Sequence, residues 1–171
     1  MSEEDYAKIL EIIKNSKSSA RLAVEMSARF AMRVSETTKI QARDFDLEKN
    51  EVHIIDSKGG RNCTKKINAE DIEFCKEMVA THSPKERIVP LLPDSVNKFL
   101  GRAMDKAGIG EKYKDCKTGI HSIRKMSAQR YFNKCRDEGK TLKESLNLTS
   151  RYLGHGDNRN ALMKTYIAKI R

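Results

Sequence analysis

No long apolar segment occurs in this sequence of 171 residues. A membrane-spanning helix needs about 20 consecutive apolar residues, and no run here approaches that length. The first ten residues, MSEEDYAKIL, also lack the basic segment followed by an apolar one that marks a secretory signal. These two absences argue against an integral membrane protein and against secretion, so we expect a cytoplasmic location.

Cysteine is scarce and is not arranged for metal binding. The cysteines are far apart in the sequence, at Cys63, Cys75, Cys116 and Cys135, and none pairs with a cysteine or histidine at the spacing of zinc ligands. The sequence also offers no carboxylate cluster suited to a divalent cation. We therefore interpret the cysteines as buried free thiols, and we expect no metal and no other cofactor.

Positive charge, in contrast, is abundant. The chain has 34 lysine and arginine residues against 24 aspartate and glutamate residues, which gives a formal net charge of +10. This balance favours polyanionic partners, because basic side chains neutralise phosphates and release their counterions. Ribosomal, membrane-surface and nuclease proteins share the property, so a specific function has to be sought in particular residues.

The apolar pattern predicts a mainly helical domain with one small antiparallel β-sheet (α+β). The chain length is ordinary for one domain. Apolar residues at helical spacing predict a helix from Ser2, its N-cap, to about Lys14, and a second helix that continues to Arg33. Further helices are predicted over 69–80, 94–108, 121–135, 142–153 and 160–170. The residues expected to cap or begin other helices are Ser35, Asp94, Thr141 and Asn158.

Two strand-like runs, Val52–Ile55 and Cys63–Ile67, flank the segment DSKGGRN. The paired glycines of this segment permit a tight reversal, so we predict a β-hairpin with Lys58 at or beside its turn. The preceding segment RDFDLEKN, residues 43–50, is rich in polar turn formers and is predicted as a turn.

Four short segments follow one another in an informative order: AMRVSE (31–36), DSKGGRNCTKKI (56–67), HSIRK (121–125) and YLGHGDNRNALMKTYI (152–167). They resemble the scattered active-site motifs of the tyrosine recombinases, also called phage-type integrases. Those motifs are a GLRxSE box, a lysine-bearing β-hairpin, an HxxR box, and LGH followed by a tyrosine-bearing helix. No single motif is specific, but their joint order is. The resemblance extends from about Arg21 to Lys169.

The resemblance implies the catalytic-domain fold of that family, and Glu36 as a structural companion of the first arginine. The six catalytic residues that it implies are Arg33, Lys58, His121, Arg124, His155 and Tyr166. The implied function is site-specific DNA recombination, integration or excision, in which a strand is cut and rejoined through a covalent 3′-phosphotyrosyl intermediate. The chain departs from the family where Ala31 replaces a usual glycine and where Lys125 replaces a frequent histidine.

The chemistry of phosphodiester transfer independently favours this set. Negative charge on the nonbridging oxygens needs a stable cationic clamp, which the guanidinium groups of Arg33 and Arg124 supply. A tyrosine phenol has a pKa of about 10, so Tyr166 needs a proton acceptor or a positive pocket to become a nucleophile. We nominate His121 as the acceptor, because histidine exchanges protons near neutral pH.

The remaining roles belong to His155, as a hydrogen-bonding partner of a phosphate oxygen, and to Lys58, which the resemblance implies is the general acid for the leaving 5′ oxygen. Each site residue also has an ordinary structural explanation, such as a surface ion pair for an arginine or core packing for a tyrosine. Around Lys58 the choice stays open, because Arg61, Lys65 and Lys66 are alternative phosphate contacts. We predict DNA contacts by Arg61, Lys65 and Lys125.

Two other functions remain possible for the sequence: a noncatalytic DNA-binding module of the same fold, and a type IB topoisomerase. The complete set of site residues favours a recombinase over the former, and the compact spacing from LGH to Tyr166 favours it over the latter.

We expect residues 1–171 to form a single catalytic domain, with 1–20 as an N-terminal helix or linker and the family's core-binding domain absent. Expected partners are double-stranded DNA, on which the chain assembles as a dimer to tetramer, and a core-binding domain that is either separate or removed. When bound to DNA, the protein is expected at the nucleoid.

Overall fold

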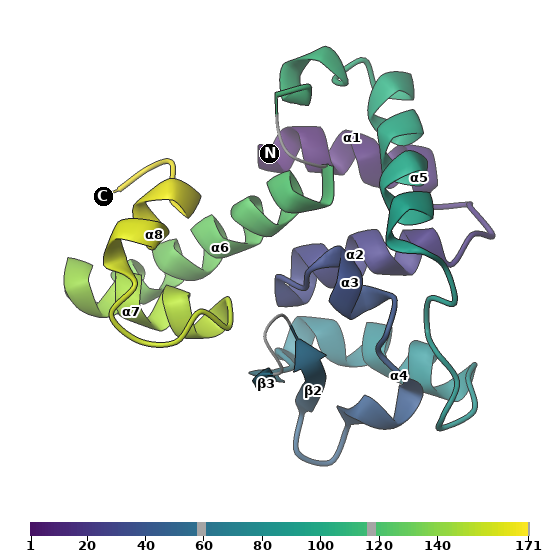
Figure 1. Ribbon diagram of the computed structural model, residues 1–171, viewed down its shortest axis with the longest axis horizontal. Helices are drawn as coiled ribbons and strands as arrows, with labels where there is room; N and C mark the ends of the chain where they lie inside the picture. Colours follow the sequence, from purple (N-terminus) through teal and green to yellow (C-terminus); the bar gives the residue numbers. More distant parts are fainter. Residues whose placement is uncertain (58–60, 116–118, 171) are drawn as a thin grey trace.

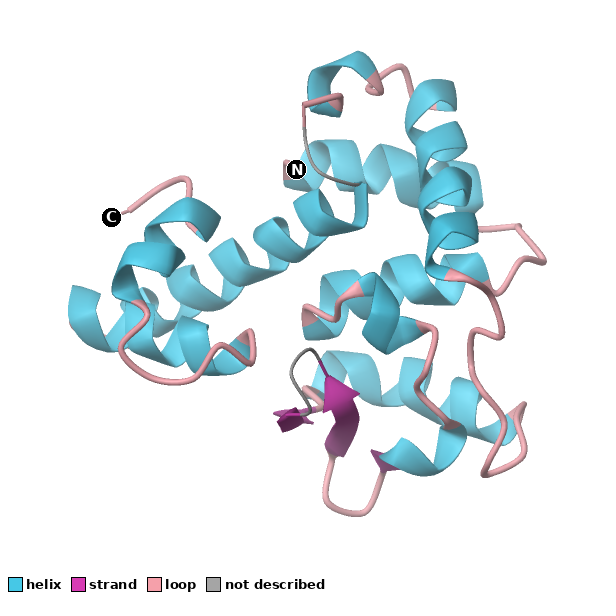
Figure 2. Ribbon diagram, viewed as in Figure 1, coloured by secondary structure: helices cyan, strands magenta, loops and turns pink. Residues whose placement is uncertain are grey.

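The structure is a computed structural model that describes residues 1–57, 61–115 and 119–170. Its α-helices are α1 (Glu3–Ile13), α2 (Ala20–Phe30), α3 (Val34–Thr37), α4 (Ile72–Ala80), α5 (Pro93–Lys106), α6 (Gly119–Asp137), α7 (Leu142–Tyr152) and α8 (Asn160–Tyr166). The strands β1 (Phe45–Asp46), β2 (Glu51–Ser57) and β3 (Arg61–Lys66) form an antiparallel sheet in the order β1-β2-β3. The predicted mainly helical fold with a small antiparallel sheet is confirmed (Figure 2).

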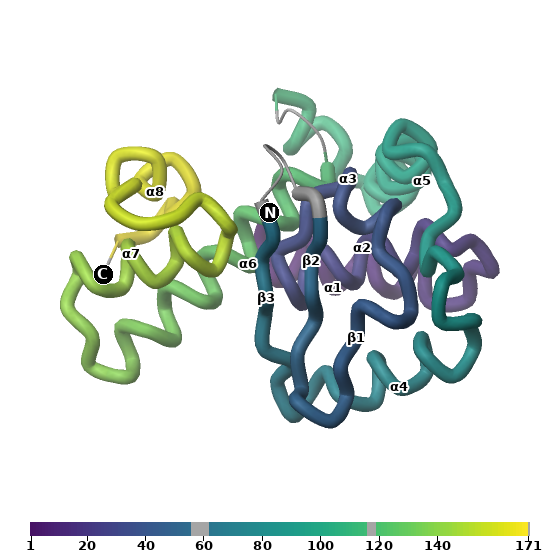
Figure 3. The backbone as a smooth tube through the Cα atoms, turned by 60° about the horizontal axis from the view of Figure 1, so that its bottom comes forward, coloured from purple at the N-terminus to yellow at the C-terminus, as the bar shows by residue number. Residues whose placement is uncertain are grey.

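Helix α6 connects two parts of the molecule (Figure 1). One part contains α1 to α5 and the sheet, and the other contains α7 and α8. The first half of α6 contributes Ile123 and Met126 to the core of the larger part, whereas its second half contributes Phe132 to a smaller core with Leu146 and Met163. Figure 3 shows the strands side by side, with β3 at the edge nearest to the C-terminal helices. In the part of the chain that the structure describes, no helix combines the length and apolarity that a membrane crossing requires.

Several predicted helix boundaries are confirmed by their capping hydrogen bonds. The Ser2 hydroxyl accepts the backbone N–H of Asp5 at 3.2 Å and begins α1. Thr141 caps α7 in the same way, through the N–H of Glu144 at 3.3 Å. Gly154 follows that helix with a φ of 70°, a left-handed conformation that glycine adopts without steric cost.

Three other predicted helix starts are wrong. Ser35 lies inside α3, because the backbone N–H of Arg33 donates to the Glu36 carboxylate and Arg33 becomes the N-cap. Asp94 lies in the first turn of α5, which begins at Pro93, a residue whose fixed φ suits the first helical position. Asn158 has a φ of 56° and precedes the N-cap of α8 by one residue, so it belongs to the connecting loop.

Strand β1 was not predicted. Its two residues, Phe45 and Asp46, pair with Val52 and Glu51 within the segment interpreted as a turn. A strand of two residues is too short to show the alternation of apolar and polar side chains on which sequence patterns depend. The predicted hairpin of β2 and β3 is confirmed, and its turn lies outside the described residues.

Candidate active site

The first predicted arginine lies at a sharp change of chain direction. Helix α2 ends at Phe30, and Ala31 then adopts a left-handed conformation, with a φ of 49° and a ψ of 37°. This reversal places Arg33 at the start of α3, where its side chain is one-fifth exposed. The left-handed conformation explains why glycine suits the position of Ala31, since glycine has no Cβ to clash there.

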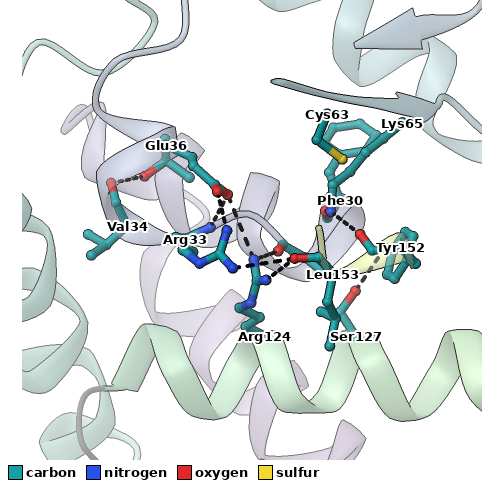
Figure 4. A network of polar contacts seen from close by, with 12 residues as sticks. Phe30, Arg33, Val34, Glu36, Cys63, Lys65, Arg124, Ser127, Tyr152 and Leu153 are labelled. Atoms are coloured by element: carbon teal, nitrogen blue, oxygen red, sulfur yellow. Dashed lines mark hydrogen bonds and ion pairs between the residues drawn. The ribbon is translucent and has the colours of Figure 1, made fainter. Parts of the chain in front are cut away.

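The second predicted arginine, Arg124, extends from α6 into the interior and is only 2% exposed. Its Nη1 donates a hydrogen bond to the carbonyl of Ala31, and its Nη2 donates to the carbonyl of Leu153 at 2.5 Å. The Nη2 of Arg33 donates to the same Leu153 carbonyl at 3.5 Å (Figure 4). One carbonyl at the end of α7 therefore helps to hold both guanidinium groups together.

Glu36 compensates the charge of this arginine pair. Its Oε1 accepts a hydrogen bond from Arg33 Nη1 at 2.6 Å, and its Oε2 lies 3.7 Å from Arg124 Nη1. Burial and the neighbouring Arg33 lower the pKa of the Arg124 guanidinium, while Glu36 and the side chain of Tyr166 oppose that shift. The arrangement agrees with the expected role of Glu36 as a structural companion of the arginine.

Tyr166 is the last residue of α8, and two histidine rings lie against it. The centre of its ring is 5.5 Å from that of His121, at an interplanar angle of 64°, and 5.5 Å from that of His155, at 57°. Lys125 Nζ lies 5.9 Å from the centre of the Tyr166 ring. His121, Arg124 and Lys125 reach this position together because they share one face of α6 at spacings of three and four residues.

His155 follows Gly154 in the loop after α7 and is held neutral near pH 7. Burial, together with the charges of Arg124 and Arg33, lowers the pKa of its imidazole to about 4. Its Nε2 atom is buried and has no hydrogen-bond partner within the described residues. A neutral ring with an unsatisfied nitrogen beside two guanidinium groups suits the binding of a phosphate oxygen.

A pocket of about 220 Å³ opens beside the arginine pair, between the sheet and the loop after α7. Arg33, Glu36, Cys63, Lys65 and Gly154 are among the residues that line it. Tyr166 is not among its lining residues, so the cationic side of the site faces the pocket and the tyrosine lies to one side.

A second pocket of about 880 Å³ is larger, but Tyr166, His121 and His155 are not among the residues that line it. It is lined by side chains that include Tyr6, Tyr131 and Tyr152. We assign the site to the smaller pocket because that one contains Arg33 and Glu36.

Of the predicted site residues, the structure brings together Arg33, His121, Arg124, His155 and Tyr166. Lys58 lies outside the described residues. Arg61 begins β3, and its side chain is likewise outside the description. Within the described ranges, no three histidine, cysteine, aspartate or glutamate side chains lie close enough together to hold a metal ion.

Lys65, which was predicted as a DNA contact, is almost fully buried. Its side chain is 5% exposed, and its Nζ donates hydrogen bonds to the carbonyls of Phe30 and Tyr152, both at 2.6 Å. The sequence contained a signal for this burial, because alternation along a strand places Lys65 on the same face as Cys63 and Ile67. Lys65 therefore contacts the protein interior and also lines the pocket beside Arg33, and its contact with DNA stays a prediction.

Comparison with known proteins gives a consistent assignment of the fold. A search of curated protein sequences gave no match. Among solved structures, the chain is similar to XerA recombinase, with a TM-score of 0.69 and 15% identity over 99% of this chain and 60% of that one. It is also similar to the lambda integrase catalytic core, with a TM-score of 0.65 and 22% identity over 91% of this chain and 94% of that one.

Longer lambda integrase chains match as well. A lambda integrase tetramer bound to a Holliday junction gives a TM-score of 0.70 and 20% identity, over 100% of this chain and 50% of that one. This chain therefore spans 60% of the XerA recombinase chain and half of that lambda integrase chain. Residues 1–159 match the sequence profile described as the phage integrase family, up to the residue before α8. The chain belongs to the phage integrase family.

Proposed function

We propose that this chain cuts and rejoins DNA in site-specific recombination, and that Tyr166 forms a 3′-phosphotyrosyl intermediate. The observation that carries the proposal is the position of Tyr166, which lies against two histidine rings and interacts with the buried Arg124. Family membership and the fold shared with XerA recombinase and lambda integrase support it.

In the proposed reaction, the Tyr166 oxygen attacks the phosphorus of a backbone phosphate. A phosphorus–oxygen bond to the tyrosine forms, the bond to the 5′ oxygen breaks, and the 3′ side of the strand remains on the protein. Arg33 and Arg124 stabilise the charge that develops on the nonbridging oxygens, because guanidinium groups bind phosphate strongly and remain charged. Rejoining is the reverse reaction, with a 5′ hydroxyl as the nucleophile.

Proton transfers are assigned to the residues around the phosphate. His121 accepts the proton of Tyr166, whose ring it contacts. His155, neutral because of its lowered pKa, donates a hydrogen bond to a phosphate oxygen. Lys58 donates a proton to the leaving 5′ oxygen, a role that rests on its place in the motif, and Lys125 contacts DNA beside the tyrosine.

The partners follow from the same reaction. The substrate is double-stranded DNA, and the lambda integrase dimer on a core site and tetramer on a Holliday junction support assembly of this chain on DNA as a dimer to tetramer. We further propose that residues 1–171 act as one catalytic domain. A cytoplasmic location, at the nucleoid when DNA is bound, accompanies this function.

The decisive experiment is a covalent capture on nicked suicide duplexes whose core sequence is randomised. The wild-type chain is incubated with the library, and protein-linked DNA is isolated under denaturing conditions and sequenced. We expect adducts at a 3′ phosphate within a defined sequence, none with Tyr166→Phe, and wild-type adducts with Tyr131→Phe as the matched control.

Each other outcome contradicts part of the proposal. Adducts that persist in Tyr166→Phe overturn the assignment of the nucleophile. The absence of adducts on every sequence favours a noncatalytic DNA-binding module. Adducts distributed over unrelated sequences, with relaxation of supercoiled plasmid, favour an activity of the type IB topoisomerase kind.

A further inference from the structure

Lys65 joins the ends of two helices that are distant in the sequence. Its Nζ donates to the carbonyl of Phe30, the last residue of α2, and to the carbonyl of Tyr152, the last residue of α7 (Figure 4). The last carbonyls of a helix have no partner within the helix and form the negative end of its dipole. One buried ammonium group therefore satisfies two helix ends at once.

Arg124 makes the same connection one residue further along both segments. It donates to the carbonyls of Ala31 and Leu153, which directly follow Phe30 and Tyr152. Two cations, one from β3 and one from α6, thus bridge the same two stretches of backbone at adjacent residues. Arg124 is one of the predicted catalytic residues, whereas Lys65 was predicted only as a contact of phosphate or DNA.

The two bridged stretches lead directly into the site. From Phe30 the chain reaches Arg33 in three residues, and from Tyr152 it reaches His155 in three residues. Fixing these helix ends therefore fixes the separation of Arg33 and His155. We propose that Lys65 is a positioning residue for strand cleavage, which holds the ends of α2 and α7 together so that Arg33 and His155 face one phosphate. This inference rests on the proposed function of the site.

Two physical observations favour a positioning role over simple core filling. Lys65 is on the inward face of β3, next to the position of the buried Ile67 that follows the strand, and an apolar residue would pack there without burying a charge. Burial and the neighbouring Arg124 lower the pKa of its amino group to about 7, so the protonated form is held at a cost in free energy. The two short hydrogen bonds of this cation, of 2.6 Å each, fix the distance between the two helix ends, which an apolar side chain would not do.

The first test needs no DNA. Hydrogen exchange, measured by mass spectrometry, is compared for wild type, Lys65→Met and the control Lys49→Met, an exposed lysine that pairs with Asp46 in the turn before β2. We expect at least tenfold faster exchange in residues 31–38 and 150–156 of Lys65→Met, with unchanged exchange in α1 and in the control. Unchanged exchange in both site segments, or an equal increase throughout the chain, overturns the inference.

The second test distinguishes a change in the cleavage rate constant from a change in the amount of active protein. In single-turnover cleavage of a captured site, Lys65→Met is expected to lower the rate constant at saturating DNA at least tenfold, while the half-saturating DNA concentration changes less than threefold. Lys65→Arg, which keeps the cation and its donors, is expected to restore the rate constant to within threefold of wild type. A reduced amplitude with a wild-type rate constant indicates only partial unfolding and overturns the positioning role.

The two tests also separate this inference from the function on which it rests. If the wild type itself cleaves no DNA, the proposed function fails, and hydrogen exchange still decides whether Lys65 holds the two helix ends. If thermal unfolding shows that Lys65→Met does not fold, Lys65→Gln, which keeps one polar donor, is measured in both assays against the same criteria.

Discussion

The two halves of the site are built in different ways. The arginine half is held by hydrogen bonds from Arg124 to two backbone carbonyls and by the buried carboxylate of Glu36. The tyrosine half lies at the end of the short helix α8, where Tyr166 makes ring contacts with two histidines. Beyond it, Gln129 Oε1 accepts the backbone N–H groups of Ala168 and Lys169 at 2.9 and 3.0 Å on the exposed surface.

Within one site, the arginine half therefore contributes mainly to the stability of the fold, and Tyr166 contributes mainly to the reaction. Buried hydrogen bonds to charged groups contribute strongly to stability, whereas exposed contacts contribute little. The phosphate-binding half is therefore part of the framework of the domain and is preorganised for a charged ligand. The Tyr166 side chain adds reactivity with little effect on the free energy of unfolding.

The largest effect on stability is expected from Arg124→Gln. The substitution removes one of the two guanidinium groups that balance the buried Glu36, the donor to the Ala31 carbonyl, and the shorter of the two hydrogen bonds to the Leu153 carbonyl. The free energy of unfolding should therefore fall by about 3 kcal/mol or more. Urea unfolding followed by circular dichroism measures this change. The control is Arg130→Gln on the same helix, an exposed partner of Glu3, with an expected loss of less than about 1 kcal/mol. Equal losses in the two variants would show that the arginine half is not part of the framework.

A smaller effect is expected from Ala31→Val. The residue is fully buried with a φ of 49°, where a β-branched side chain clashes with the backbone, and we expect a loss of about 2 kcal/mol in the free energy of unfolding. Ala31→Gly, which relieves the backbone but removes a buried methyl group, should stay within about 1 kcal/mol of wild type. If valine is tolerated as well as glycine, the left-handed reversal before Arg33 does not determine the stability of this half.

The pH dependence of stability tests the state of His155. Its pKa is lowered to about 4, so between that pH and the unfolded value of 6.5 the unfolded chain binds more protons than the folded one. Stability should therefore fall as the pH drops from 6.5 toward 4. Between pH 7.5 and pH 5 the wild type should lose roughly 1 kcal/mol more than His155→Asn, after allowance for solvent screening of a partly exposed ring. His82→Asn serves as control; identical losses in wild type and His155→Asn would contradict the depressed pKa.

The smallest effect on stability is expected from Tyr166→Phe, which removes only a hydroxyl group. The free energy of unfolding should change by less than about 1 kcal/mol, because the ring contacts with both histidines remain and only the interaction of the hydroxyl with Arg124 is lost. Formation of the covalent adduct should nevertheless be abolished. A stability loss comparable to that of Arg124→Gln, in the same urea titration, would remove the distinction between the two halves.

The order of the motifs allowed most of the site to be predicted from the sequence. Arg33, His121, Arg124, His155 and Tyr166 were nominated from segments that are up to 133 residues apart (166 − 33), and the structure brings these segments together. The positions of N-caps such as Ser2 and Thr141 were also predictable, because capping is a local interaction between neighbouring residues.

What escaped prediction depends on contacts between distant segments. The burial of Lys65 follows from the alternation along β3. Its two acceptors, however, are backbone carbonyls at the ends of α2 and α7, and no residue type in the sequence identifies a carbonyl as an acceptor. The position of Arg33 as the N-cap of α3 depends on which backbone N–H the Glu36 carboxylate accepts, and the composition of the segment does not determine this. Strand β1 exists only because β2 lies beside it.

The path of the chain between Arg124 and His155 determines where such a domain can accept inserted residues. Thirty residues separate them in the sequence (155 − 124 − 1), yet both reach the carbonyl end of α7, because α6 runs away from the site and α7 returns to it. Residues added at the connection between these helices leave both ends in place. An insertion within the first turns of α6 is different, since each residue rotates the helix by about 100° and would part His121 from Arg124. The connection between α6 and α7 can thus vary in length without moving the site residues, whereas the spacing of His121 and Arg124 along α6 cannot change.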